Sequence, residues 1–495
     1  MSLMSEKDLY KFPDDFKFAC ATAAYQVEGA FNEDGRAASI WDTFTHEGGS
    51  ANHDTGDIAC NSYHLWKRDI EMIKSLGVQQ YRFSISWPRI LPDGTTKNVN
   101  QKGVDYYKNL VKALINEGIE PMITLFHWDL PQSLQDRGGF INPEIIQNFA
   151  DFARFCFKTF GDSVKFWITF NEPIIFTEMG HCGHPWEHAP GAFGKHNQWI
   201  HYWVAHNIML AHAHAVKVYR EEFKEKQGGQ IGIVQVLSDY YPMTHKKEDE
   251  EAAESMRYFF QERFLQPIYG DGNYPEHVKN RIWENCKKQG RITSRLPEIT
   301  EEEKKLIKGS ADFIGVNYYL SHRVRALEDG EANIASGNVL DIDIGGKFSD
   351  WLNDHPDGFR ASLNLFKKRY GDIPIYITEN GVRDSPGEGL HDPSRIKYLR
   401  GHLVAVAQAI QDGVNVKGYT VWSLMDNFEW GFGYDRKYGI FQVDFNDPNR
   451  KRTPKESAEF FKNVVKTRSV QAKSVSKEDV LRGPPFLVPD EVEEP

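Results

Sequence analysis

The chain has 495 residues, of which 40% are hydrophobic and 26% are charged, a composition typical of globular proteins with a large core. Acidic residues number 70 and basic residues 59, giving a net charge of −11, which argues against a nucleic acid as partner. The sequence contains no run of about 20 apolar residues, so we expect no membrane-spanning helix.

The cysteines are odd in number, widely scattered and in no Cys-x-x-Cys pair: Cys20, Cys60, Cys156, Cys182 and Cys286. This pattern indicates neither a disulfide framework nor a thiolate metal site. The first residues lack the apolar segment of a secretory signal. We therefore expect a cytoplasmic protein, or a secreted one if a signal peptide has been removed.

Eight short runs rich in β-branched and aromatic residues alternate with longer amphipathic stretches, a pattern typical of repeated β-α units. The predicted strands cover residues 16–19, 81–86, 122–126, 166–170, 231–236, 313–317, 375–378 and 418–422. Apolar residues at helical spacing end at Gly77 and at Gly118, and a further helical pattern starts at Pro143. We predict an α/β fold consisting of a single (β/α)₈ TIM barrel.

The predicted barrel forms one catalytic domain over residues 1–467, followed by a polar C-terminal tail over residues 468–495. Two stretches rich in Gly, His, Asp and Pro, at about 180–198 and 329–357, are expected to be long loops over the C-terminal face of the barrel.

Polar and aromatic residues repeatedly follow the apolar runs. Glu172 and Glu379 lie far apart in the chain, yet each closes a predicted strand and each adjoins an Asn. Catalytic groups of such barrels lie at the C-terminal strand ends, so both carboxyls are expected in one site. Hydrolysis of an acetal between sugars needs this pair, because one acid protonates the departing oxygen while the other meets the positive centre.

The surroundings expected for each carboxyl suggest different roles. Arg82, on the second predicted strand, is a fixed cation that can reach Glu379 across a barrel and keep it ionised as the nucleophile. Glu172 lies close to that charge and is partly desolvated, so its pKa should be raised and it should act as the acid and then as the base.

Two motifs carry a family resemblance. Thr169-Phe170-Asn171-Glu172-Pro173 and Ile377-Thr378-Glu379-Asn380-Gly381 resemble the acid/base and nucleophile signatures of the family 1 glycoside hydrolases, the β-glucosidases and their relatives. The match runs from about residue 12 to about residue 466. By this resemblance the substrate-binding residues are Gln26, His127, Asn171, Tyr319, Trp422, Glu429 and Trp430. Trp422 is the implied stacking floor for the sugar, Arg82 is a supporting residue, and Asn317 and Tyr319 would support Glu379.

The resemblance implies a retaining β-glycosidase that hydrolyses terminal non-reducing β-D-glucosides by double displacement, with β-galactosides and β-fucosides as secondary substrates. The implied partner is a small-molecule glycoside, and no cofactor or metal is expected. His206, His212 and His214 lack the spacing of a zinc motif, and we interpret them as helix packing and buried hydrogen bonds. A homodimer is left open.

Three alternatives stay open. Plant thioglucosidases of the family carry Gln where this chain has Glu172, but arthropod thioglucosidases that retain the Glu keep a β-thioglucosidase open. Net glycosyl transfer to an acceptor shares the first half-reaction with hydrolysis. A barrel that binds glycans or receptors without turnover is disfavoured by the presence of both carboxyls.

Overall fold

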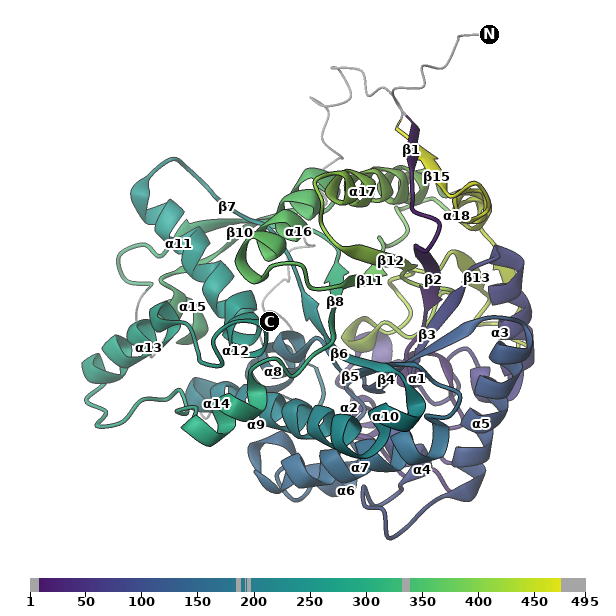
Figure 1. Ribbon diagram of the computed structural model, residues 1–495, viewed down its shortest axis with the longest axis horizontal. Coiled ribbons are helices and arrows are strands. Elements are labelled where there is room, and N and C mark those ends of the chain that lie inside the picture. Colours follow the sequence, from purple (N-terminus) through teal and green to yellow (C-terminus); the bar gives the residue numbers. More distant parts are fainter. Residues whose placement is uncertain (1–8, 184–187, 192, 194–196, 332–338, 473–495) are drawn as a thin grey trace.

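The computed structural model of the chain describes residues 9–183, 188–191, 193, 197–331 and 339–472. Eight parallel strands close into a barrel in the order β11-β12-β2-β3-β4-β5-β6-β8 (Figure 1). They are β2 Lys17–Ala21, β3 Gln80–Ser84, β4 Glu120–Phe126, β5 Phe166–Asn171, β6 Gln230–Val236, β8 Phe313–Tyr318, β11 Ile375–Asn380 and β12 Val416–Val421. The predicted (β/α)₈ barrel and its eight strands are confirmed.

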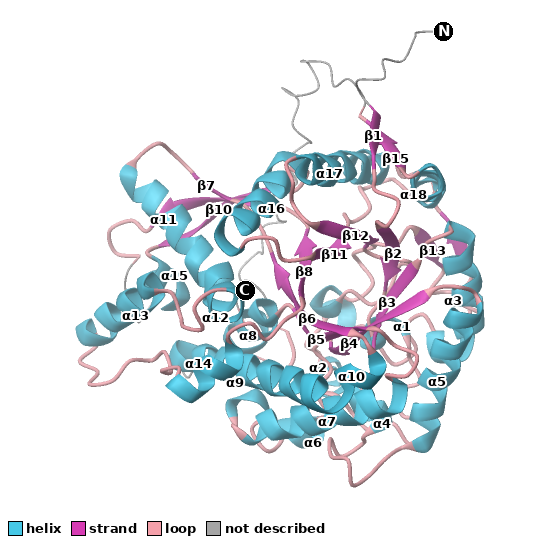
Figure 2. Ribbon diagram, in the orientation of Figure 1, coloured by secondary structure: helices cyan, strands magenta, loops and turns pink. Residues whose placement is uncertain are grey.

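Helices surround the barrel strands (Figure 2). The longer ones are α3 Ser62–Leu76, α5 Gln101–Asn116, α7 Glu144–Phe160, α8 Pro173–Cys182, α9 Asn197–Val218, α11 Lys247–Arg257, α13 Glu276–Lys288, α16 Pro356–Tyr370, α17 Pro393–Gln411 and α18 Glu456–Thr467. Shorter ones are α1 Ala24–Val27, α2 Ile40–His46, α4 Trp87–Ile90, α6 Gln132–Gln135, α10 Lys224–Gln227, α12 Arg263–Tyr269, α14 Glu301–Ile307 and α15 Val339–Ile344. Helix α3 ends at Gly77, whose φ of 72° is the left-handed conformation that glycine adopts without strain.

Apolar side chains fill the interior of the barrel. Phe166 on β5 and Tyr376 on β11 have ring centroids 5.4 Å apart, although these strands are not neighbours in the barrel. The contact therefore crosses the interior. Together with Met122, Ile168, Val234 and Phe313, these two residues form a buried cluster. The strands thus enclose a packed core, as side-chain layers do in barrels of this kind.

A three-stranded sheet lies outside the barrel, formed by β10 Gly346–Leu352, β9 Ser321–Ala326 and β7 Tyr240–Pro242. Helix α15 and strand β10 fall within 329–357, where we expected only a loop, so that prediction was wrong for these residues. Strand β10 is ordered by antiparallel pairing with β9, a tertiary contact that its mixed composition does not reveal. Residues 332–338, and 184–187, 192 and 194–196 of the other predicted loop, lie outside the described residues.

The two ends of the described chain pair with each other. Strand β1 (Leu9–Lys11) runs antiparallel to β15 (Ser469–Gln471), and β13 (Phe441–Val443) pairs with β14 (Arg452–Pro454). Strand β15 covers the first residues of the predicted tail, whereas 473–495 lie outside the described residues. No helix in the described ranges is both long and apolar enough to cross a lipid bilayer.

Candidate active site

The two glutamates singled out by the sequence both lie at strand ends and are buried. Glu172 directly follows β5 and caps the start of α8, with Pro173 as the first helical residue. Its φ of 46° places a residue with a side chain in the left-handed region, which costs energy and is concentrated at functional sites. Glu379 is the fifth residue of β11. Glu172 is 6% exposed and Glu379 is 4% exposed.

Each carboxylate oxygen of Glu379 accepts a hydrogen bond. Arg82 Nη1 lies 2.5 Å from Oε1 in a buried ion pair, and the Tyr319 hydroxyl donates to Oε2 at 2.6 Å. A cation and a phenol at hydrogen-bond distance both stabilise the ionised form of a carboxyl group. The predicted reach of Arg82 across the barrel to Glu379 is therefore confirmed.

Glu172 has a different environment. Its Oε1 accepts a hydrogen bond from Asn317 Nδ2 at 2.6 Å. Burial, and after it the negative charge of Glu379, raise the pKa of Glu172 to about 8, because both disfavour a second negative charge in the site. Glu172 therefore carries a proton at neutral pH and can donate it.

Asn317 contacts a different glutamate from the one expected. We expected it to support Glu379, beside which it lies in the pairing of β8 with β11. Its amide nitrogen instead donates to Glu172 and, at 3.2 Å, to Asn171 Oδ1. The hydroxyl of Thr378 donates to Asn317 Oδ1 at 2.7 Å, which fixes the amide orientation and turns its nitrogen toward the acid.

Arg82 links Glu379 to the residues around Glu172 by hydrogen bonds. Its Nη2 donates to Asn171 Oδ1 at 2.6 Å, so a chain of hydrogen bonds runs from Glu379 through Arg82, Asn171 and Asn317 to Glu172. Its Nε donates to Thr124 Oγ1 at 3.2 Å. Sequence reasoning gave no role to Thr378, although it stands in the nucleophile motif, and it missed Thr124, whose only signal was a hydroxyl residue within an otherwise apolar strand.

Gln26 and Glu429 form a second polar group in the site. Gln26 Nε2 donates to Asn427 Oδ1 at 3.0 Å and to Glu429 Oε2 at 3.3 Å, and sequence reasoning gave Asn427 no role of its own. Burial, and after it the charge of Glu379, raise the pKa of Glu429 to about 8. Gln26 Oε1 is buried with no hydrogen-bond partner among the described residues, and such an acceptor fits a hydroxyl donor.

His127 joins this polar group to the carboxylates. Its Nε2 lies 3.0 Å from Asn171 Nδ2, which can only donate, so the proton of the neutral ring is assigned to Nδ1. Burial and the charge of Arg82 hold the pKa of His127 well below its ordinary value, which keeps the ring neutral. Within the described ranges Nδ1 has no hydrogen-bond partner.

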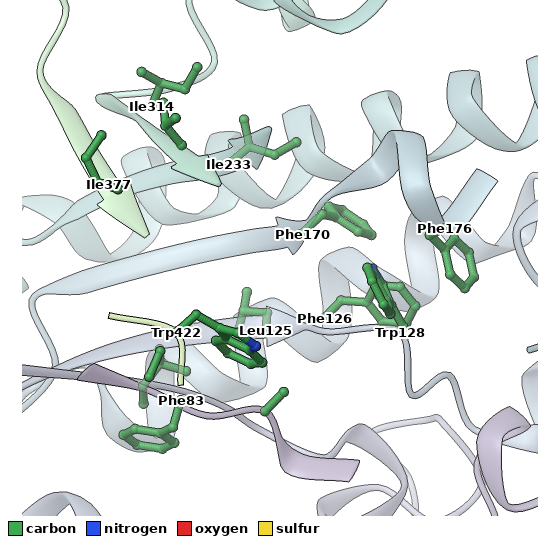
Figure 3. Close-up of a cluster of buried hydrophobic side chains, with 14 of the residues drawn as sticks. Phe83, Leu125, Phe126, Trp128, Phe170, Phe176, Ile233, Ile314, Ile377 and Trp422 are labelled. Carbon is green, nitrogen blue, oxygen red and sulfur yellow. The ribbon is translucent and has the colours of Figure 1, made fainter. Parts of the chain in front are cut away.

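Aromatic rings form one wall of the site. The ring of His127 stacks on those of Trp422 and Trp430, with centroids 6.0 and 5.7 Å away. Trp128, which was not among the predicted site residues, lies 4.7 Å from Trp430 and donates from Nε1 to Asn171 O at 2.8 Å. Figure 3 shows Trp128 and Trp422 beside apolar side chains of the barrel strands. Indole faces of this kind match the C–H face of a sugar ring.

His206, His212 and His214 of α9 are the histidines that we interpret from the sequence as helix packing and buried hydrogen bonds. His206 Nδ1 lies 3.0 Å from the Tyr274 hydroxyl and His212 Nδ1 lies 2.7 Å from Thr169 Oγ1. The described residues contain one cluster of side chains able to ligate a metal ion: Glu178, Cys182 and His201.

Comparison with known proteins agrees with this geometry. The model of glycosyl hydrolase family 1 matches residues 9–470. A cytosolic beta-glucosidase of Homo sapiens is 43% identical over 469 residues, which are 93% of this chain and 99% of that protein. The structure of an aphid myrosinase superposes with a TM-score of 0.86 at 41% identity, covering 92% of this chain and 99% of the other.

The structure of a family 1 β-glucosidase from Thermotoga maritima superposes with a TM-score of 0.83 at 41% identity, covering 94% of this chain and all of the other. The resemblance inferred from the two glutamate motifs is thereby confirmed over almost the whole chain. The chain belongs to glycosyl hydrolase family 1 and is a retaining glycosidase of the β-glucosidase type.

Proposed function

We propose that Glu379 is the nucleophile and Glu172 the acid/base residue in hydrolysis of terminal, non-reducing β-D-glucosides. The observation that carries this assignment is the unequal surroundings of two equally buried carboxyls. Glu379 is paired with Arg82 and Tyr319, whereas Glu172 accepts from the neutral amide of Asn317 and has its pKa raised to about 8.

In the first step a carboxylate oxygen of Glu379 forms a bond to the anomeric carbon of the sugar. The bond from that carbon to the aglycone oxygen breaks, and Glu172 gives its proton to the departing oxygen. The products of this step are a free aglycone alcohol and a glycosyl ester of Glu379. Arg82 and Tyr319 hold Glu379 in one orientation, which reduces the entropy cost of the attack.

In the second step the roles of the carboxyls reverse. Ester formation removes the negative charge of Glu379, so the pKa of Glu172 falls and the carboxylate formed by the first step remains ionised. Glu172 then takes a proton from water while the water oxygen attacks the anomeric carbon and Glu379 leaves as carboxylate. Two inversions at the same carbon retain the configuration.

We place the sugar against the polar group and the aromatic wall. Gln26 Oε1 and the Nδ1–H of His127, both unpaired in the described part of the chain, supply an acceptor and a donor for its hydroxyls, and Asn171, Tyr319 and Glu429 supply further polar atoms. Trp422 and Trp430 offer ring faces to the C–H face of the sugar. Glucose as the preferred sugar is supported by the β-glucosidases among the similar proteins; β-galactosides and β-fucosides are secondary substrates.

The variant Glu379→Gly tests the assignment. It should lose at least about 10³-fold in hydrolysis of an aryl β-glucoside, as removal of a nucleophile does. Added azide should restore turnover and give the glycosyl azide of inverted configuration. The matched control Glu388→Gly removes a carboxyl of the loop before α17, which accepts a hydrogen bond from Ser394 N in the first turn of that helix, and this variant should stay active. Undiminished hydrolysis by Glu379→Gly would contradict the assignment.

Hydrolysis of thioglucosides is a second candidate activity, favoured by the likeness to an aphid myrosinase at a TM-score of 0.86. A thiolate leaves with less need of a proton than an alkoxide. Paired assays of an aryl β-D-glucoside and its thio analogue decide between the two, and product analysis with an added acceptor alcohol measures the share of glycosyl transfer.

We propose a cytosolic location, supported by the cytosolic β-glucosidase relatives. Fractionation of the source cells with an antibody against the chain tests it. A homodimer stays a prediction, which sedimentation velocity of the purified chain would test.

A further inference from the structure

A mixed group of metal-ligand side chains lies between two helices beside the barrel. Glu178 and Cys182 are one turn apart on α8, and His201 is on α9. The oxygen, sulfur and nitrogen atoms that these side chains offer lie within 4.8 Å of one another. We propose that Glu178, Cys182 and His201 form a zinc site, which adds a metal to a chain for which the sequence predicts none.

The three donors suit zinc in kind and in distance. Zn²⁺ binds thiolate at about 2.3 Å and imidazole or carboxylate at about 2.0–2.2 Å, so neighbouring ligand atoms of a tetrahedral site are about 3.3–3.8 Å apart. Because the ligand atoms lie within 4.8 Å of one another, binding needs them to close by at most roughly 1–1.5 Å. Cys182 is the last residue of α8 and precedes Gly183 in the left-handed conformation, where a small movement of the helix end is easiest.

Burial distinguishes this group from surface carboxylates that carry no ion. Glu178 and His201 are each 1% exposed, and Cys182 is partly exposed, which gives an ion a route of entry. A thiolate, an imidazole and one carboxylate form a donor set that prefers zinc to calcium or magnesium, whose ligands are oxygen atoms. Three protein ligands leave the fourth position to a water molecule.

Arg263 is a cation in contact with this group, and it contributes to the charge balance of the proposed site. It is fully buried, and its Nη2 lies 2.6 Å from Glu178 Oε1, so the metal is assigned to the other oxygen, Oε2. The carboxylate and the thiolate neutralise Zn²⁺, and Arg263 leaves one positive charge. This charge makes the site weaker than one with the same ligands and no arginine, while the ion pair orients the carboxylate as outer partners of metal ligands do.

Binding of zinc to Cys182 releases the proton of its thiol. In the metal-free chain Cys182 is hydrogen-bonded to Glu178, and zinc replaces the thiol proton: the S–H bond breaks, the S–Zn bond forms, and one proton enters solvent. The bound ion would fasten the end of α8 to α9 across residues 183–196. Because Glu172 directly precedes α8 as its N-cap residue, the site would hold the same helix whose other end carries the acid.

Zinc uptake by untagged protein tests the proposal. Equilibrium dialysis followed by elemental analysis should give about one Zn²⁺ per wild-type chain, and Co²⁺ should give a thiolate-to-metal absorption band. Cys182→Ser keeps a hydroxyl donor toward Glu178 and removes the thiolate, so both signals should be lost. The control Cys286→Ser alters a buried cysteine whose Sγ accepts from Arg295 N, and it should bind zinc as the wild type does.

Either of two dialysis results would overturn the site: no stoichiometric zinc in the wild type, or equal uptake by the wild type and Cys182→Ser. If Cys182→Ser fails to fold, as judged by circular dichroism, His201→Gln takes its place with the same expectation. Wild-type binding should also release about one proton per zinc, measured by calorimetry in two buffers of different ionisation enthalpy; release of none contradicts a thiolate ligand.

Discussion

The surroundings of Glu379 and Glu172 differ in charge but not in burial. Both side chains are almost fully buried, so loss of solvent raises the cost of ionising either one. The negative charge of Glu379 is compensated by the ion pair with Arg82 and the hydrogen bond from Tyr319. Glu172 accepts a hydrogen bond from the neutral amide of Asn317 and lies near the negative charge of Glu379. The two carboxyls therefore differ in their neighbouring charges and hydrogen-bond donors, and not in their depth of burial.

The largest effect is expected when the acid alone is removed, because this separates the role of Glu172 from that of Glu379. Glu172→Gln cannot donate a proton, so hydrolysis of an alkyl β-glucoside should fall by about 10²–10⁴-fold. A dinitrophenyl β-glucoside, whose leaving group needs no proton, should lose far less in the first step. Steady-state and burst kinetics on both substrates measure the difference.

Glu388→Gln is the matched control for that experiment and should behave as the wild type does on both substrates. Equal losses on the alkyl and dinitrophenyl substrates would show that Glu172 does not act by proton donation.

A smaller effect on the rate is expected for Asn317, whose substitution tests whether it tunes the acid. Its hydrogen bond to Glu172 lowers the pKa of that carboxyl against the opposing effect of burial. Asn317→Ala should therefore raise the pKa of Glu172. In the profile of kcat/KM against pH, the base limb should move from about pH 8 to higher pH. The rate should fall about tenfold, because one hydrogen bond in the site is lost.

Thr378→Ser keeps the hydroxyl that orients the amide of Asn317 and should leave the base limb in place. A base limb that stays fixed or moves to lower pH in Asn317→Ala would mean that Asn317 does not tune the acid.

The smallest effect concerns stability. Glu429 and Glu172 both have pKa values raised to about 8, against about 4.3 for an unfolded glutamate. Between those pH values the folded state binds more protons than the unfolded state, so the free energy of unfolding should fall as pH rises. Glu429→Gln removes one of these groups, and thermal unfolding at several pH values should give a shallower fall. A slope identical to that of the wild type would contradict the raised pKa of Glu429.

The sequence was sufficient for the barrel and for the two carboxyls because both depend on local patterns. Parallel strands buried on both faces appear as short apolar runs, and the residue after each run reaches the same face of the barrel. This is why Glu172 and Glu379 could be paired despite their separation in the chain.

Features that depend on tertiary contacts were not predictable. Asn317 contacts Glu172 because Thr378 orients its amide, and strand β10 exists because β9 pairs with it. The proposed zinc ligands have no motif spacing, since Glu178 and Cys182 share a helix turn but His201 comes from the next helix. In each case the deciding partner lies on another element.

The most direct test measures the proton on Glu172 before and after Glu379 is esterified. Carbon-13 NMR titration of glutamate-labelled enzyme, with the Glu172 signal assigned by its absence in Glu172→Gln, should give a pKa near 8 in the free enzyme. After Glu379 is trapped with a 2-deoxy-2-fluoroglucoside, that pKa should drop, because the charge that raises it is gone. An unchanged pKa in the trapped enzyme would contradict the division of roles between the two carboxyls.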